Sequence, residues 1–244
     1  MLRCVMYLMV SLLILSFSAN VQAQFGTDII KTDKGDLKIT FLGHASLLFE
    51  FDGKMIYADP ASSLDWEKMP KADLVLITHN HGDHLKPDII KTLSTEKTIL
   101  VADERSAAQV KAAKAMKNGD ETTVLGLKIE AVPAYNIVHM RSADTPYHPK
   151  GHGNGYITTF GDKRVYVAGD TENIPEMQAL KNIDVAFLPM NLPYTMTPEM
   201  VVDAAKTFKP KILYIYHYRG SDTDKLQELM KEVKEVELRI RKMY

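Results

Sequence analysis

The residues best suited to chemistry lie in one short stretch, in which three histidines and one aspartate fall within six positions. The stretch directly follows the apolar run 74–77, which has the length and β-branched content of a buried strand, and it precedes a helix-like pattern. Imidazole and carboxylate groups together form a ligand set for Zn, Mn or Fe. The four residues are His79, His81, Asp83 and His84.

The spacing within this stretch predicts two neighbouring metal sites. His79 and His81 are two positions apart, so their side chains project the same way from an extended backbone. Gly82 allows the chain to bend, and Asp83 and His84 can then face a second point a few ångströms away. A polar surface turn that happens to be rich in histidine is the alternative interpretation.

Two more candidates follow apolar strand-like runs. Asp170 comes after 165–169, where a carboxylate could bridge two metals, and His217 comes after 212–216. Taken alone, Asp170 could be a helix N-cap and His217 an ordinary strand-end histidine. The cluster at 79–84 favours the metal-ligand interpretation for both.

The third ligand of the first site is expected from the long aperiodic stretch 134–155, because loops of this length are usually functional or disordered. It contains three histidines, His139, His148 and His152. We favour His148, because Tyr147 and Pro149 would restrict its movement. His139 is the second choice, because it lies closer to the strand ending near 134, and His152 is the third.

Composition restricts the class of protein. The chain has 244 residues, of which 45% are apolar and 25% charged, and its formal net charge is −1. These values are ordinary for a globular protein, and they provide no basic surface that would indicate nucleic-acid binding.

The N-terminus predicts export. Arg3 precedes the apolar run 5–17, which is short for a membrane span, and 21–23 offers small residues for cleavage. We therefore predict a signal peptide at 1–23, a mature domain at 24–244, and a periplasmic or secreted protein without stable membrane insertion. A retained anchor is the alternative. The one cysteine, Cys4, precedes the cleavage position, so the mature chain can form no intramolecular disulfide.

Short strands and helices alternate along the mature chain. This pattern predicts an α/β protein, a four-layer αββα sandwich of two mixed β-sheets flanked by helices. The expected helices are at 83–94, 106–116, 175–180, 198–208 and 224–233. The expected strands are at 37–42, 46–51, 55–58, 74–77, 97–101, 122–132 (two strands around Gly126), 156–160, 164–168, 184–189, 211–216 and 235–242.

The order of these residues resembles the metallo-β-lactamase superfamily: His-x-His-x-Asp-His, a later His, Gly-Asp-Thr at 169–171, and a strand-end His. The segments 43–46 (Gly-His-Ala-Ser) and 58–60 (Ala-Asp-Pro) are also similar to short superfamily signatures. The segments 189–191 and 194–196 resemble a loop of the branch that includes ascorbate-6-phosphate lactonase.

That resemblance implies a role for each matching residue. His79, His81 and a loop histidine would hold one metal ion, Asp83, His84 and His217 the other, and Asp170 would bridge them. His44 and Asp59 would orient ligand imidazoles. The chain departs from the pattern at 134–136 (Ala-Tyr-Asn), where many members carry the third histidine. Either His148 reaches in from the loop, or Asn136 is a weak ligand, or one metal ion binds tightly.

These residues predict a metal-dependent hydrolase with two divalent ions, Zn being favoured over Mn or Fe. A hydroxide shared by the ions would attack an ester, lactone, amide or phosphodiester of a small-molecule substrate, with Asp83 and Asp170 in the catalytic centre. Asn191, Tyr194 and Thr195 follow a strand that ends near the site, so they are the predicted substrate contacts. A non-catalytic metal-binding protein of the same fold is the alternative function. The oligomeric state is left open.

Overall fold

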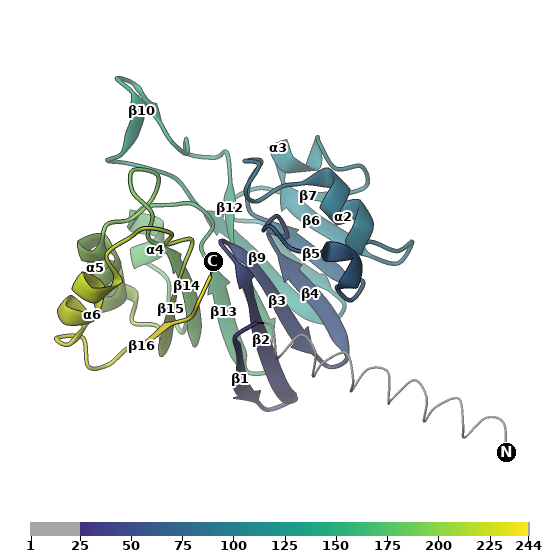
Figure 1. Ribbon diagram of the computed structural model, residues 1–244, viewed down its shortest axis with the longest axis horizontal. Coiled ribbons are helices and arrows are strands. Elements are labelled where there is room, and N and C mark those ends of the chain that lie inside the picture. The colour runs from purple at the N-terminus through teal and green to yellow at the C-terminus, as the bar shows by residue number, and fades with distance from the viewer. Residues whose placement is uncertain (1–24, 244) are drawn as a thin grey trace, which may run out of the picture.

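Residues 25–243 are described by the computed structural model, and they are organised around two seven-stranded sheets (Figure 1). In the N-terminal sheet, the strands lie in chain order. Its first four strands pair antiparallel and its last four pair parallel, with β4 common to both sets. They are β1 (Thr27–Thr32), β2 (Gly35–Gly43), β3 (Ser46–Phe51), β4 (Lys54–Ala58), β5 (Leu74–Ile77), β6 (Ile99–Asp103) and β7 (Lys114–Met116).

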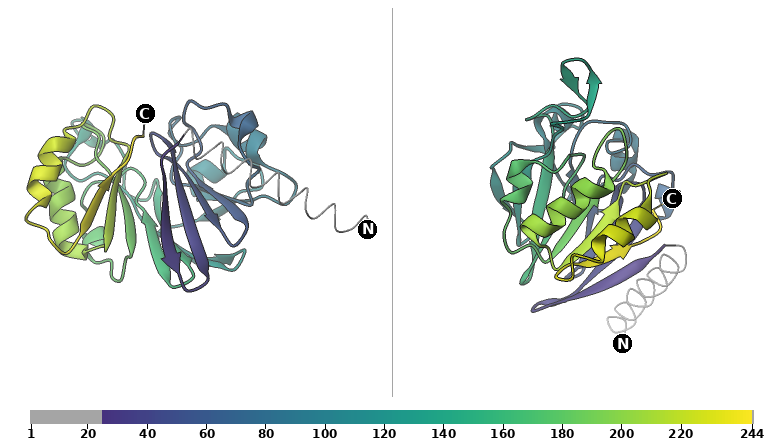
Figure 2. Two further views of the ribbon diagram at one scale, coloured as in Figure 1. Left: turned by 60° about the horizontal axis from the view of Figure 1, so that its bottom comes forward. Right: turned by 90° about the vertical axis from the view of Figure 1, so that its left-hand side faces the viewer.

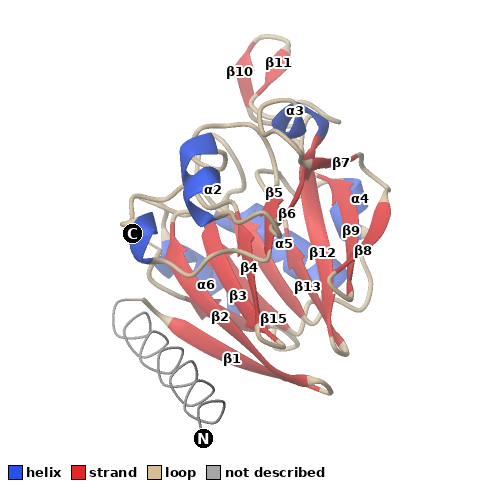
Figure 3. Cartoon of the chain, turned by 90° about the vertical axis from the view of Figure 1, so that its right-hand side faces the viewer, coloured by secondary structure: helices blue, strands red, loops and turns tan. Residues whose placement is uncertain are grey.

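The C-terminal sheet has the order β16-β15-β14-β13-β12-β9-β8 and is also mixed, with parallel pairing from β13 to β16. Its strands are β8 (Glu121–Val124), β9 (Leu127–Pro133), β12 (Asn154–Phe160), β13 (Lys163–Val167), β14 (Val185–Pro189), β15 (Ile212–Tyr216) and β16 (Glu237–Ile240). A separate hairpin of β10 (Met140–Ser142) and β11 (Thr145–Pro146) projects from the body (Figure 3).

Helices cover the outer face of each sheet, and the two sheets face each other (Figure 2). The predicted four-layer αββα sandwich is confirmed. Outside the N-terminal sheet lie η1 (Trp66–Lys68), α2 (Pro87–Leu93) and α3 (Glu104–Ala107). Outside the C-terminal sheet lie α4 (Pro175–Gln178), α5 (Pro198–Phe208) and α6 (Thr223–Met230).

Alternation along the strands explains this layering, because successive side chains of a strand point to opposite faces. Leu47 and Phe49 of β3 belong to the apolar layer between the sheets, whereas Leu48 between them packs with the residues under η1 and α2. Aromatic contacts join the two sheets: the Phe49 and Phe187 ring centroids are 5.8 Å apart. Burial of each such side chain stabilises the fold by about 1.5–3 kcal/mol.

The predicted helix at 106–116 is wrong. Helix α3 ends at Ala107, and residues 114–116 instead form β7, which pairs in parallel with β6. The alanines favour a helix, but the free edge of β6 offers backbone hydrogen bonds and Met116 becomes buried. Strand β1 was not predicted either; the first predicted strand was 37–42, and β1 pairs antiparallel with β2.

The predicted signal peptide at 1–23 lies outside the described residues. Within 25–243 the longest helix is α5, with 11 residues, and no helix has both the length and the apolar character needed to cross a membrane.

Candidate metal centre

The site forms where strands of both sheets end. His79, His81 and His84 follow β5, Asp170 follows β13, and His217 follows β15. Because β4 and β5 run parallel, as do β13 to β15, their carboxyl ends bring these residues to a common edge. Six of the eight histidines of the chain meet there, together with Asp83 and Asp170.

A first group of ligand atoms comes from three histidines. One nitrogen each of His79, His81 and His148 lies within 4.8 Å of the others, and Nε2 of His148 is 3.2 Å from Nδ1 of His81. His79 and His148 are buried and His81 is half-buried. Of the three candidates in the long loop, the structure places His148 in this group.

The rear nitrogens of two of these rings are held by neighbours. Nδ1 of His79 is 3.0 Å from Oγ1 of Thr78, and Nδ1 of His148 donates to Oδ1 of Asn136 over 2.7 Å. The Thr78 hydroxyl donates its proton to Oδ2 of Asp59, so Nδ1 of His79 donates to Thr78. In the neutral form, each ring then has its proton on Nδ1 and the lone pair of Nε2 faces the site. Asn136 is a positioning residue for His148, because its Nδ2 is also engaged by Glu172 and by the carbonyl of Tyr194.

A second group consists of His44, Asp83, His84 and His217, again within 4.8 Å of one another. Oδ2 of Asp83 is 3.0 Å from Nε2 of His44 and 3.4 Å from Nε2 of His217. His84 and His217 are buried, whereas the side chain of Asp83 is 49% exposed. This group therefore combines imidazole with carboxylate and opens toward solvent.

Asp170 lies between the two groups. Its Oδ2 is 3.2 Å from Nε2 of His148, and its Oδ1 is 3.3 Å from Nε2 of His84. Gly169 makes this position possible: its φ is +67°, and an added Cβ would lie 3.0 Å from both the Asn154 carbonyl oxygen and Cβ of Thr78. A buried carboxylate that touches both groups has the position of a bridging ligand.

Electrostatics act differently on the groups of the centre. Burial works to lower the pKa of His84, but the carboxylates of Asp170 and Asp59 outweigh it and raise that pKa well above its ordinary value. Burial lowers the pKa of His79 well below its ordinary value, and the neighbouring His84 adds to the effect. Burial works against ionisation of Asp170, but the imidazoles of His217 and His84 outweigh it and hold the pKa of Asp170 well below its usual range. His79 is thus neutral and Asp170 ionised at neutral pH.

The donor atoms fit divalent metal ions. Three buried atoms of the centre have no hydrogen-bond partner among the described residues: Nε2 of His79, Nε2 of His84 and Oδ1 of Asp170. A buried polar atom without a partner costs about 1–3 kcal/mol, so their convergence needs an explanation. Nitrogen and carboxylate oxygen are donors for Zn, Mn and Fe, and coordination would satisfy all three atoms.

Asp59 organises the rear of the site from the end of β4. Its carboxylate, which is fully buried, accepts hydrogen bonds from the backbone N–H of Thr78 at 2.8 Å and from Nδ1 of His84 at 2.7 Å. His84 therefore directs Nε2 into the site.

Asp59, His44 and His217 all have left-handed backbones, with φ of 45°, 52° and 48°. Such strain in residues other than glycine is typical of functional sites.

The other two loop histidines have different partners. Nδ1 of His139 is 2.5 Å from Oε1 of Glu172, and Nε2 of His152 accepts from Arg105 at 2.7 Å. Glu172, which the sequence analysis missed, also accepts from the backbone N–H groups of 137–139 and so shapes the loop that carries His148. Its position directly after the Gly-Asp-Thr segment was the available clue.

The three predicted substrate contacts lie beside the site and support neighbouring groups. The Asn191 amide is 3.4 Å from Nδ1 of His217. Thr195 is buried and exchanges hydrogen bonds with the backbone of Asn191. Tyr194 is 44% exposed, and its ring packs against that of Tyr147 at 5.0 Å. Their contact with substrate stays a prediction.

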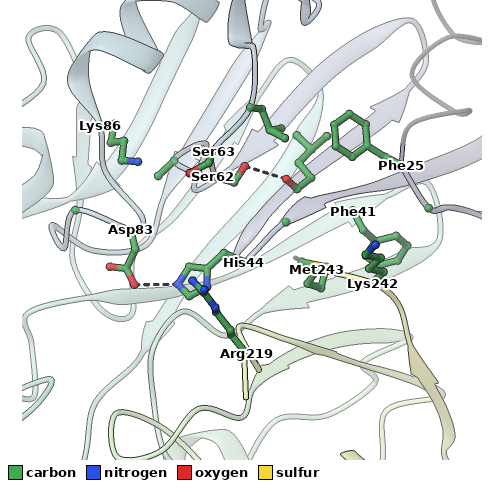
Figure 4. Close-up of a pocket in the computed structure, with 16 residues that line it drawn as sticks. Phe25, Phe41, His44, Ser62, Ser63, Asp83, Lys86, Arg219, Lys242 and Met243 are labelled. Atoms are coloured by element: carbon green, nitrogen blue, oxygen red, sulfur yellow. Dashed lines mark hydrogen bonds and ion pairs between the residues drawn. The ribbon is translucent and has the colours of Figure 1, made fainter. Parts of the chain in front are cut away.

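Two cavities flank the ligand groups. A cavity of about 670 Å³ adjoins the second group at His44 and Asp83 (Figure 4), and one of about 300 Å³ adjoins the first group at His79, His81 and His148. Neither is lined by Asn191, Tyr194 or Thr195. Volumes of about 300–1,000 Å³ are those of small-molecule sites.

Comparison with known proteins shows the family of this chain. Residues 38–217 match the family model of the β-lactamase superfamily domain. The chain is 32% identical over 197 residues to a UPF0173 metal-dependent hydrolase of Pelotomaculum thermopropionicum, covering 75% of this chain and 84% of the relative. It is 30% identical over 218 residues to one of Thermococcus kodakarensis, covering 82% and 95%.

A solved structure agrees in fold and in sequence. The crystal structure of a protein from Parabacteroides distasonis that is named as a metal-dependent hydrolase superposes with a TM-score of 0.85 at 47% identity. The match covers 90% of this chain and all of the other. Igni18, a metallo hydrolase from Ignicoccus hospitalis, superposes with a TM-score of 0.69 at 26% identity, covering 85% and 95%.

Proposed function

This chain belongs to the metallo-β-lactamase superfamily and is a metal-dependent hydrolase, and from that premise we propose that it holds two divalent ions and cleaves an ester, lactone or phosphodiester of a small molecule. His79, His81 and His148 would hold one ion, and Asp83, His84 and His217 the other. Asp170 would contact both. Zn²⁺ is the proposed metal, because the donor set is rich in imidazole.

The observation that carries the proposal is the convergence of buried Nε2 of His79, Nε2 of His84 and Oδ1 of Asp170, none of which has a hydrogen-bond partner among the described residues. Ions bound there would supply hydroxide at neutral pH and offset the negative charge that develops on the substrate. The protein's own contribution is orientation: Asp59 and Asn136 fix which nitrogen of His84 and His148 faces the site. Asp170 holds its negative charge between both groups.

Elemental analysis of the purified protein, followed by assays, tests the proposal. We expect two divalent ions per chain and turnover of a carboxylic ester, a lactone or bis-4-nitrophenyl phosphate. Chelation should abolish turnover and readdition of the metal should restore it. Metal binding without turnover of any of these substrates would instead favour a non-catalytic metal-binding protein.

Export is part of the proposal. It is supported by the sequence of 1–23, with its basic start, apolar run and small residues before the cleavage position. The intact mass of protein recovered from the periplasm or medium should correspond to a chain that begins at position 24. Protein that begins at Met1 and is retained in the membrane would contradict export.

A further inference from the structure

The larger cavity has a distinct charge pattern. Lys86, Arg219 and Lys242 line it together with His44 and Asp83 (Figure 4). The three cations come from separate places: the approach to α2, the loop after β15 and the segment after β16. Asp83 is the one carboxylate in the lining, and it already belongs to the second ligand group.

The side chains of these three cations have no hydrogen-bond or ion-pair partner within 25–243, and all three residues are exposed. Nearby arginines behave differently: Arg239 and Arg241 both bind Asp28. Three unpaired positive charges around one cavity create a field that favours an anion.

Part of the remaining wall is apolar, beside Ser62 and Ser63. Phe41, Leu42 and Met243 are buried, and Phe25 and Leu64 are half-buried. The backbone N–H of His44 donates to the carbonyl of Met243, which fixes the C-terminal segment as part of the wall. A ligand that fills this cavity would therefore bury apolar surface as well as meet cations.

Five of the sixteen residues that line this cavity, Gly26 among them, lie outside the segment that matches the family model. The family match spans residues 38–217, which includes all seven proposed ligands, whereas Phe25, Arg219, Lys242 and Met243 fall outside it. The reaction centre thus lies within the shared domain, and the cavity wall is built partly by segments beyond that domain.

The smaller cavity is less suited to the same role. Its volume is about 300 Å³, and its two arginines are already engaged. Arg105 donates to His152, and the Arg141 guanidinium carbon lies 5.7 Å from the centre of the Tyr147 ring.

We propose that the substrate is an anionic molecule with an apolar portion. It lies in the larger cavity with its anionic group near Lys86, Arg219 and Lys242 and its apolar portion against Phe41 and Met243. Its scissile bond then faces the second ligand group at Asp83. This substrate class rests on the hydrolytic function proposed above.

Binding tests the cavity independently of turnover. Titration calorimetry on the metal-loaded chain compares the affinities for hexanesulfonate and hexan-1-ol. A sulfonate is a weak ligand for divalent metals, so a preference for hexanesulfonate measures its interaction with the lysine and arginine side chains of the cavity. We expect the sulfonate to bind at least about tenfold more tightly, and Arg219→Gln combined with Lys242→Gln to remove most of that difference. Lys206→Gln, an exposed lysine on α5, is the matched control and should change nothing.

Equal affinity for the two probes, or a preference that the double variant leaves intact, would overturn the proposed recognition. Unchanged melting temperatures show that the variants are folded. Turnover adds a second comparison, between 4-nitrophenyl hexanoate and the 4-nitrophenyl monoester of adipic acid, which differ in a terminal carboxylate. We expect a higher kcat/KM for the adipate ester, and the double variant should lose this advantage.

The two proposals fail separately. Charge-dependent sulfonate binding without hydrolysis of any ester, lactone or phosphodiester would overturn the hydrolytic proposal and still support anion recognition by the cavity. Hydrolysis of the hexanoate and adipate esters at equal rates, without sulfonate preference, would support the hydrolytic function and overturn the substrate class.

Discussion

The two sheets contribute to the centre in different ways. The N-terminal sheet provides a contiguous cluster, in which one turn after β5 carries His79, His81, Asp83 and His84. The C-terminal sheet provides Asp170 and His217 from the ends of two strands, and the loop before β12 adds His148. The cluster is thus placed by local backbone geometry, whereas the single residues reach it only because the sheets pack face to face.

The largest effect should come from the residue of the C-terminal sheet that touches both groups. Asp170→Asn removes a buried negative charge within 3.3 Å of Nε2 of both His84 and His148. We expect the metal content to fall below one ion per chain and kcat to fall roughly a thousandfold.

The matched control for that prediction is Asp184→Asn, which alters a buried carboxylate that binds the backbone of Arg164 at the far end of β13. It should lower stability and leave the metal content unchanged. Retention of two ions by Asp170→Asn would show that the centre does not need this carboxylate to bind metal.

A smaller effect is expected for the loop ligand. His148→Ala removes one of three nitrogens in the first group, so one of the two ions should be lost, as measured by elemental analysis. His139→Ala is the control from the same loop, since that ring binds Glu172, and it should retain both ions. The reverse result would move the third ligand from His148 to His139.

Substitution of a residue that orients a ligand should lower metal binding less than substitution of the ligand itself. In Asp59→Asn, the amide is a weaker acceptor for Nδ1 of His84, so the affinity for metal should fall about 10–100-fold in a chelator competition. Asp73→Asn tests a carboxylate that binds the backbone of Met55 at the opposite end of β5 and should leave this affinity intact. Equal affinities in the two variants would contradict the orienting role of Asp59.

The smallest effect is expected for the contact that Asp28 makes between the two sheets. Asp28 of β1 accepts from Tyr214 of β15 and from Arg241 after β16. Burial raises the pKa of Asp28, but these bonds outweigh it and leave the pKa lowered. A lowered pKa in the folded state means that the stabilisation is present above the unfolded pKa and is lost as the pH falls through the folded value.

Asp28→Asn should therefore lower the free energy of unfolding by about 1–2 kcal/mol at pH 7, and the difference should shrink in acid. Chemical denaturation across pH 3–7 measures both. Asp36→Asn removes the exposed pair with Lys31 on the same hairpin and should have little effect at any pH. If the free energies of unfolding of wild type and Asp28→Asn differ by the same amount from pH 7 to pH 3, the contact of Asp28 is not sensitive to acid.

Much of the fold and of the centre could be predicted from the chain alone. The strand before His79, the strands before Asp170 and His217, and the four-layer architecture follow from apolar runs of strand length and from alternation. The structure of residues 106–116 could not be predicted correctly. The hydrogen bonds that favour a strand over a helix at 114–116 come from the edge of β6, which is distant from the local sequence pattern.

The sequence by itself determined the cluster at 79–84, since a six-residue turn of imidazole and carboxylate is a local feature whose side chains are positioned by the backbone of that turn. Only the tertiary structure decided which loop histidine joins that turn, because the choice depends on Asn136, Glu172 and Arg105 binding the three rings differently. It also determined that Lys86, Arg219 and Lys242 line one cavity. These residues are far apart along the chain and come together only because the two ends of the domain pack beside the site.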